Sequence, residues 1–261
     1  MLKREFFTNL KSLIIFSSIL VVTYILVIAI YPSIATSGLN INEILKVFPE
    51  ELLKVFNMDI FDISTALGWL ETEGFIFWIL LSGFYSAILG ATILTKEEND
   101  KTIEILLSKP VSRNEVVINK LICGIINVFI FNLLVYLTCV FGLLLIDDLD
   151  FKIVTLISIG TFMIDLMLFT ITLMISSFFN KTSVTRNIAL AIVFLSYIMQ
   201  IVGGLTSSLE FLKNISIFEF FSVRYIAVNN CLDPLYLILS IIIILCAILI
   251  TFINYNKKEL V

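Results

Sequence analysis

Histidine is absent from this chain of 261 residues, and cysteine occurs only four times. The absence of histidine excludes imidazole-based triads, imidazole metal sites and histidine proton relays. The cysteines form no Cys-x-x-Cys pair, which argues against a zinc site and a disulfide framework. The chain also lacks a Gly-x-x-x-x-Gly-Lys phosphate loop and has no Gly-Lys pair. We therefore expect neither an enzyme nor a cofactor or metal bound by this chain.

Charged residues are scarce as well: they make up 15% of the chain, whereas 59% is hydrophobic. A soluble protein has no interior large enough for so many apolar side chains. They gather in six runs, and each is long enough to cross ~30 Å of hydrocarbon, which takes about 20 helical residues. We predict an all-α polytopic membrane protein, with residues 1–261 forming a single domain of six transmembrane helices. The predicted spans are 13–31, 75–95, 121–146, 153–179, 188–209 and 235–256.

Lysine and arginine are distributed unevenly between the loops. Twelve of the 17 lie in segments 1–12, 96–120, 180–187 and 257–261. Short loops rich in Lys and Arg remain on the cytoplasmic side, so both termini are predicted to be cytoplasmic. Because the basic residues flank the spans and the net charge is −4, nucleic-acid binding has no support.

The segments outside the spans carry amphipathic patterns. In residues 1–12 the apolar side chains fall near one helical face, which predicts an interfacial helix before the first span. A simple positively charged flank is the alternative. Segments 41–56 and 210–233 also show apolar residues at helical spacing, and we expect both to lie at the outer interface.

The cytoplasmic loop 96–120 has the most specific pattern. Ile103, Leu106 and Leu107 form one apolar stripe on a short helix. Pro110 disfavours extending that helix. A helical turn lying on the lipid surface would give the same stripe.

A second helix is expected to start directly after this corner. Ser112 followed by Glu115 is the pattern of a capping box, which begins the third span rigidly. A short amphipathic helix tied stiffly to a span is suited to passing force from a partner protein into the membrane.

The loop sequence resembles a known family. The run Thr102-Ile103-Glu104-Ile105-Leu106-Leu107-Ser108-x-Pro110-Val111-Ser112-Arg113 is similar to the cytoplasmic loop signature of ABC-2-type transporter permeases, which lies between their second and third spans, as here. The resemblance extends over the whole chain, from the N-terminal interfacial helix to the partly apolar segment before the last span. One departure is Lys101, where many members have glycine.

The resemblance implies the membrane-spanning half of an ATP-driven transporter in the cytoplasmic membrane of a bacterium. ATP and Mg would be bound by a separate ABC ATPase subunit, and a second permease subunit, identical or different, would complete the path. The helix 102–109 would be the coupling helix, with an apolar docking face and rim charges that set specificity. The implied coupling residues are Glu97, Glu98, Thr102, Ile103, Glu104, Leu106, Leu107, Pro110 and Arg113.

Two features inside the spans are notable. Asp165 is the only Asp, Glu, Lys or Arg within a predicted span, where it costs about 2.5–3.5 kcal/mol and should face protein or water. It is either a substrate, ion or proton site or a structural carboxyl paired with a polar neighbour, and Asn132 lies at comparable depth. Gly83, Ala87 and Ala91 form a small-residue ladder on the second span, with Gly90, Ser82 and Ser86 nearby, which predicts close helix packing.

The sequence thus predicts the permease of an ABC exporter. The low polar content of the spans favours a hydrophobic or amphiphilic cargo, such as a peptide antibiotic or a lipid-like molecule. Two alternatives remain: a stand-alone secondary transporter or ion exporter using Asp165, and a membrane subunit for antimicrobial sensing or immunity. An intramembrane enzyme is not favoured, because one aspartate without histidine makes no usual catalytic cluster.

Overall fold

The computed structural model describes residues 2–35, 47–99 and 112–258, and these residues form helices and connecting turns but no strands. Six of the helical segments are long and apolar enough to cross a membrane, which confirms the predicted all-α, six-span architecture. In chain order the elements are α1 (Leu2–Ala35), α3 (Glu50–Val55), α4 (Ala66–Trp69), the π-helix η1 (Leu70–Gly74), α5 (Phe75–Ile93), α6 (Lys96–Asn99), α8 (Arg113–Leu144), α9 (Phe151–Ser176), α10 (Thr182–Leu205), the 3₁₀ helix η2 (Ser207–Leu209), α11 (Glu210–Ile215), the 3₁₀ helix η3 (Ile217–Glu219), α12 (Val223–Asn229) and α13 (Pro234–Lys257).

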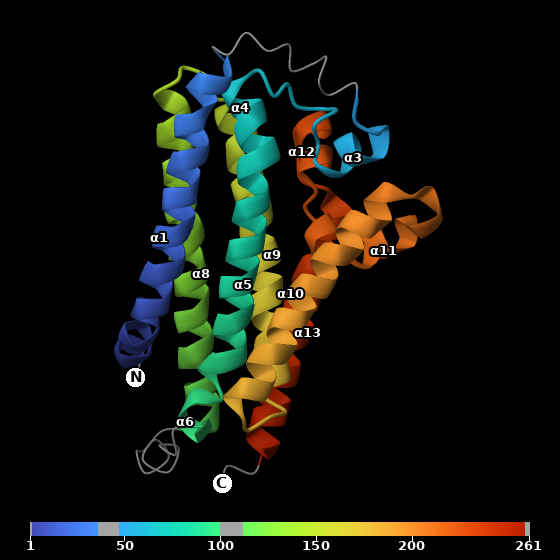
Figure 1. The fold of residues 1–261 in the computed structure, drawn as a ribbon. Coiled ribbons are helices and arrows are strands. Elements are labelled where there is room, and N and C mark those ends of the chain that lie inside the picture. Colours follow the sequence, from blue (N-terminus) through green and yellow to red (C-terminus); the bar gives the residue numbers. More distant parts are fainter. Residues whose placement is uncertain (1, 36–46, 100–111, 259–261) are drawn as a thin grey trace.

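The long helices form one elongated bundle (Figure 1). Helices α5 and α9 pack against each other, α1 packs on α8, α10 on α5, and α13 on α9. Most of the α5 side chains are buried, whereas α10 and α13 present mainly apolar side chains outward. Helix α5 is therefore the central element, and it touches partners on every side.

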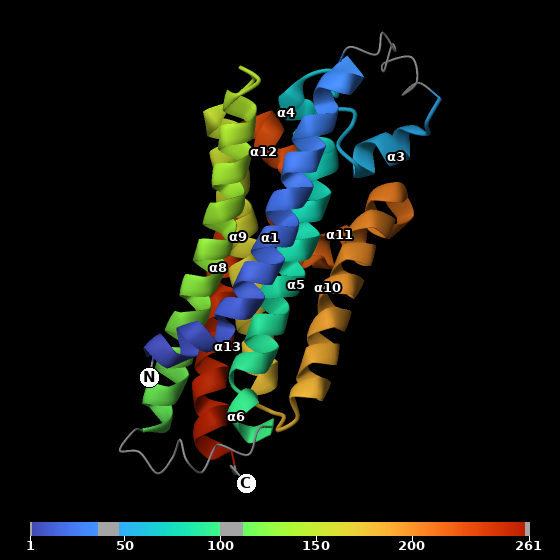
Figure 2. The ribbon, with the colours of Figure 1, turned by 60° about the vertical axis from the view of Figure 1, so that its left-hand side comes forward.

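Two of the predicted helix boundaries differ from those observed. The predicted interfacial segment and the first span form one continuous helix, α1, whose first turns lie at an angle to the remainder in Figure 2. The second span begins earlier than its apolar run, at Ala66, and passes through the π-helix η1 before α5. The two glutamates of η1 concealed this extension, because they interrupt the apolar run that defines a span in the sequence.

Capping residues fix where several helices begin. The Ser112 side chain accepts a hydrogen bond from the Glu115 backbone, and the Glu115 side chain accepts one from the Ser112 backbone, so the predicted capping box is present. Asp150 caps α9 and Asp233 caps α13 without such a reciprocal bond: each carboxylate accepts hydrogen bonds from backbone N–H groups of the first turn. Polar residues between the spans therefore act as helix start signals.

The segment between α10 and α13 folds back onto the bundle. Phe218 and Phe221 are buried, and an added Cβ on Gly83 of α5 would meet Phe218, so this segment packs closely on α5. Phe211 and Ile215, from the same predicted apolar stripe, are exposed. The segment thus inserts only its second half, η3 and α12, between the long helices.

Candidate functional site

At the end of the bundle that holds α6, buried charges connect four segments. This is the end that the positive charges assign to the cytoplasm, and α1 begins and α13 ends toward it (Figures 1 and 2). We call this group the cytoplasmic anchor; its residues are Glu5, Glu97, Glu98, Arg113, Lys120 and Lys258.

Lys120, on α8, is the centre of the anchor and is completely buried. Its Nζ lies 2.5 Å from Oε2 of Glu97 and 3.6 Å from Oε2 of Glu5, and it also donates to the carbonyl of Ile93. Both carboxylates are nearly buried. Removing the lysine would therefore leave two buried negative charges uncompensated, and removing the carboxylates would leave a buried positive charge. One ammonium group thereby ties α8 to α1, to the end of α5 and to α6.

A second ion pair attaches α6 to the residue that follows α13. Lys258 Nζ donates to Oε1 of Glu98 at 2.8 Å and to the carbonyl of Phe179 at 2.7 Å. Burial raises the pKa of Glu98 above its ordinary value, and the hydrogen bond from Lys258 partly offsets this. Lys258, the first residue after α13, and the turn after α9 are therefore held at α6.

Arg113 begins α8 and caps the carboxyl end of α13. Its Nη1 donates to the carbonyls of Tyr255, Asn256 and Lys258 at 3.3, 3.0 and 2.7 Å. A guanidinium is favourable here because the last carbonyls of a helix lack intrahelical donors and carry partial negative charge. Both flanks of segment 100–111 are thus fastened to the long helices, α6 before it and the start of α8 after it.

Of the predicted coupling residues, only three fall within the described residues. Glu97, Glu98 and Arg113 are directed at partners in their own chain. Thr102, Ile103, Glu104, Leu106, Leu107 and Pro110 lie outside the described residues. Sequence reasoning missed Glu5 and Lys258 as partners, because each lies far along the chain from its counterpart. The lone acid among the basic residues of the N-terminus was the one available signal for Glu5.

A separate polar cluster lies inside the bundle. Asp165 on α9 is fully buried, and Asn132 Nδ2 on α8 donates to its Oδ2 at 2.7 Å. Trp78 Nε1 on α5 donates to Asn132 Oδ1 at 3.3 Å. The two polar residues that the sequence placed at similar depth therefore meet, and a hydrogen-bonded chain joins three long helices. The hydroxyl groups of Ser82 and Ser86, on α5, also lie toward the Asp165 carboxyl.

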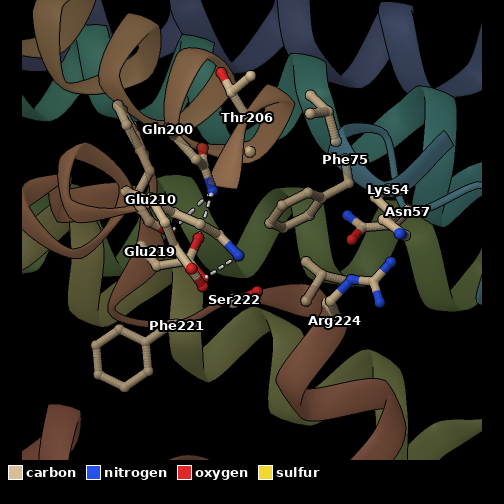
Figure 3. Close-up of a pocket in the computed structure, with 16 residues that line it drawn as sticks. Lys54, Asn57, Phe75, Gln200, Thr206, Glu210, Glu219, Phe221, Ser222 and Arg224 are labelled. Atoms are coloured by element: carbon tan, nitrogen blue, oxygen red, sulfur yellow. Dashed lines mark hydrogen bonds and ion pairs between the residues drawn. The ribbon is translucent and has the colours of Figure 1, made fainter. Parts of the chain in front are cut away.

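At the opposite end, a cavity of about 380 Å³ opens between α10, α3 and the folded-back segment (Figure 3). We call it the outer vestibule. Lys213 Nζ lies 3.0 Å from Oε1 of Glu219, and Arg224 pairs with Asp59. Burial raises the pKa of Glu219 above its ordinary value, with Lys213 opposing the shift. The outer vestibule is also lined by three phenylalanines, Phe75, Phe218 and Phe221.

The described residues thus combine six long apolar helices with a cluster of buried charges at one end and a cavity at the other. Comparison with curated proteins and with solved structures finds no match. Comparison with protein families finds a match to the family described as "ABC-2 family transporter protein", and it covers residues 1–260. Since the match spans nearly the whole chain, this membrane protein belongs to the ABC-2 transporter family.

Proposed function

We propose that this chain is the permease subunit of an ATP-driven exporter in the bacterial cytoplasmic membrane. ATP and Mg would be bound by a separate ABC ATPase subunit, and a second permease subunit, identical or different, would complete the transport path. The family match supports transport across a membrane. The proposed cargo is hydrophobic or amphiphilic, which agrees with the combination of aromatic and charged groups in the outer vestibule.

The observation that carries this proposal is the cytoplasmic anchor. An ATPase that pushes on segment 100–111 would act on two fastened flanks, α6 through Lys120 and Lys258, and α8 through Arg113. Buried, mutually dependent charges resist separation, so the movement would pass to α1, α8 and α13 together. A loosely attached surface turn would absorb the same push.

The docking face is tested by the double substitution Leu106→Asp/Leu107→Asp. We expect the wild-type chain to copurify with a phosphate-loop ATPase encoded near its gene and to alter its ATPase activity. The double variant should insert normally but lose the ATPase, because two carboxylates would be desolvated in an apolar contact. Copurification and ATP hydrolysis by the purified complex are the measurements.

Val47→Asp/Phe48→Asp is a matched control, because it places the same charges on exposed apolar residues at the opposite end of the bundle. It should retain the ATPase. If both double variants hold the ATPase as well as the wild type does, the docking face is wrong. If the wild-type chain binds no ATPase, the permease proposal gives way to ATPase-independent transport.

That second candidate, a secondary transporter or ion exporter, is favoured by the complete burial of an ionisable carboxyl, Asp165, inside the bundle. Under the exporter proposal Asp165 is structural. We therefore expect Asp165→Asn to retain export, whereas Asn132→Leu should lower the free energy of unfolding by about 2 kcal/mol because it strands Asp165 and Trp78. Export assays in vesicles and unfolding in detergent check both. Transport that needs no ATPase and is abolished by Asp165→Asn would establish the secondary transporter.

An antimicrobial-sensing or immunity subunit is the remaining alternative. It would bind the antimicrobial and protect cells while moving none of it across the vesicle membrane, so the same export assay separates it from the exporter.

A further inference from the structure

The outer segment 50–60, which we call the strap, forms one wall of the outer vestibule. It comprises α3 and the turn that follows, and its residues Lys54, Val55 and Asn57 line the vestibule. Val55 and Asn57, together with Phe56, also line a smaller cavity of about 50 Å³ between the strap, α5 and α10. One short segment therefore separates two cavities from the outer side of the bundle.

The strap is attached much more weakly than the segment that follows it. None of its side chains is buried. Directly after it, Ile63 is buried and the Tyr31 hydroxyl donates to the carbonyl of Ser64 at 2.8 Å. The backbone of Leu67 donates to Oδ2 of Asp148 at 2.9 Å. Because segments with few buried contacts open at a lower free energy than packed helices, the strap can move on a fixed base while the bundle stays intact.

An ion pair and a packing contact attach the strap to two different elements. Arg224, on α12, pairs with Asp59 of the strap, and both side chains are partly exposed. Val55 lies against Gly204 of α10: an added Cβ on Gly204 would lie 2.9 Å from Cγ2 of Val55. A partly exposed ion pair stabilises a contact only slightly, so this one can break and form again without unfolding the helices.

We propose that the strap is a movable gate at the outer end of the bundle, latched by the ion pair between Arg224 and Asp59. With the latch formed, as in this structure, Val55 and Phe56 form the outer wall of the smaller cavity. With the latch broken, both cavities become accessible from the outer side. The gate goes beyond the transport proposal, because its movement belongs to this chain alone and needs no ATPase.

The test measures how fast a cysteine beneath the strap reacts with N-ethylmaleimide in the purified full chain in nanodiscs, followed by mass spectrometry. Ile79→Cys is the reporter, because Ile79 lines the smaller cavity and is only 3% exposed. Cys246→Ser removes one exposed cysteine, and the exposed Cys231 remains as the reference for unprotected reaction. The buried Cys123 and Cys139 should stay unmodified, which shows that the bundle remains folded.

Asp59→Asn should raise the reaction rate of the reporter about two- to fivefold relative to Cys231, as expected for the loss of a partly exposed ion pair. The double variant Asp59→Asn/Arg224→Gln should react no faster, because the same pair is lost only once. Glu50→Gln is the matched control: it also removes a carboxylate from the strap, but its partner Lys54, at 3.8 Å, belongs to the same helix. The control should react as the wild type does.

Three outcomes overturn the latch: equal rates in the wild type and Asp59→Asn, an equal rise in Glu50→Gln, or a further rise in the double variant. The measurement involves no ATPase, so its failure leaves the permease proposal standing.

Gly204→Ala tests the gate through the other contact, and it decides the matter if Asp59→Asn fails to fold. Among the described residues, Val55 is the one residue outside α10 that the new Cβ would meet within 4 Å. Its β-branched side chain has little rotamer freedom, so the strap must move away from α10. The reporter should react about fivefold faster or more. Wild-type protection of the reporter overturns the gate, and so does modification of Cys139, because the whole bundle would then be opening.

Discussion

Lys120→Met is expected to lower the free energy of unfolding by about 3–5 kcal/mol, the largest loss that a single substitution should cause in this chain. The lysine is fully buried between the carboxylates of Glu97 and Glu5. Methionine retains much of the volume but removes the cation, so two nearly buried carboxylates are left facing each other. Equilibrium unfolding in mixed detergent micelles measures the loss.

Two further variants identify the charge as the cause. Lys152→Met changes an exposed lysine and should cost little. Combining Lys120→Met with Glu5→Gln and Glu97→Gln removes the stranded charges and should recover most of the stability, because neutral replacement of a whole buried ion cluster is often tolerated. If the triple variant is no more stable than Lys120→Met alone, the loss comes from packing and not from unpaired charge.

The features predicted correctly from the sequence are those set by neighbouring residues. The Ser112–Glu115 capping box spans four residues, and each apolar run is a continuous stretch of sequence, so both follow from local pattern. The sequence allows Asp165 to be either a functional site or a structural carboxyl beside Asn132, because both residues lie at the same depth in their helices. The structure shows the hydrogen bond between them.

The anchor contacts depend on tertiary structure, which local pattern does not contain. Glu5 and Lys120, and likewise Glu98 and Lys258, are distant in the chain, and nothing in either segment specifies its partner. The resemblance of the loop sequence implies that Glu97 and Glu98 contact another subunit. In the structure both are buried against lysines of the same chain and connect α6 to α8 and to the residue after α13.

Glu71 was missed for a different reason. Its surrounding sequence, Leu-Glu-Thr-Glu-Gly, resembles a polar turn before a span. The structure instead continues the helix back to Ala66, and Glu71 is buried near Tyr24 of α1 and Cys139 of α8, while Glu73 stays half-buried. Helix α5 consequently extends from the outer vestibule, which Phe75 lines, to Ile93, whose carbonyl accepts from Lys120.

Gly90→Ala is expected to be the second most damaging substitution, at about 3 kcal/mol of unfolding free energy, because overpacking a tight helix contact usually costs 1–3 kcal/mol and backbone contacts lie at the upper end. A Cβ on Gly90 would lie 2.2 Å from the carbonyl oxygen of Phe169 and 2.3 Å from Oγ1 of Thr172. Since the nearest atom belongs to the backbone of α9, the two central helices must move apart.

Gly83→Ala, on the same helix, is the control: it also replaces a glycine of α5 by alanine, but at a position where no backbone atom lies as close. Its Cβ would meet only side-chain atoms, at 3.2 Å from Leu168 and 3.3 Å from Phe218, and these can shift by a few tenths of an ångström. We expect a loss of less than about 1 kcal/mol. Both variants gain the same helix propensity from alanine, so unfolding in detergent compares packing alone. Equal losses would show that α5 and α9 do not approach most closely at Gly90, and that the small-residue ladder acts as a whole in bringing the helices together.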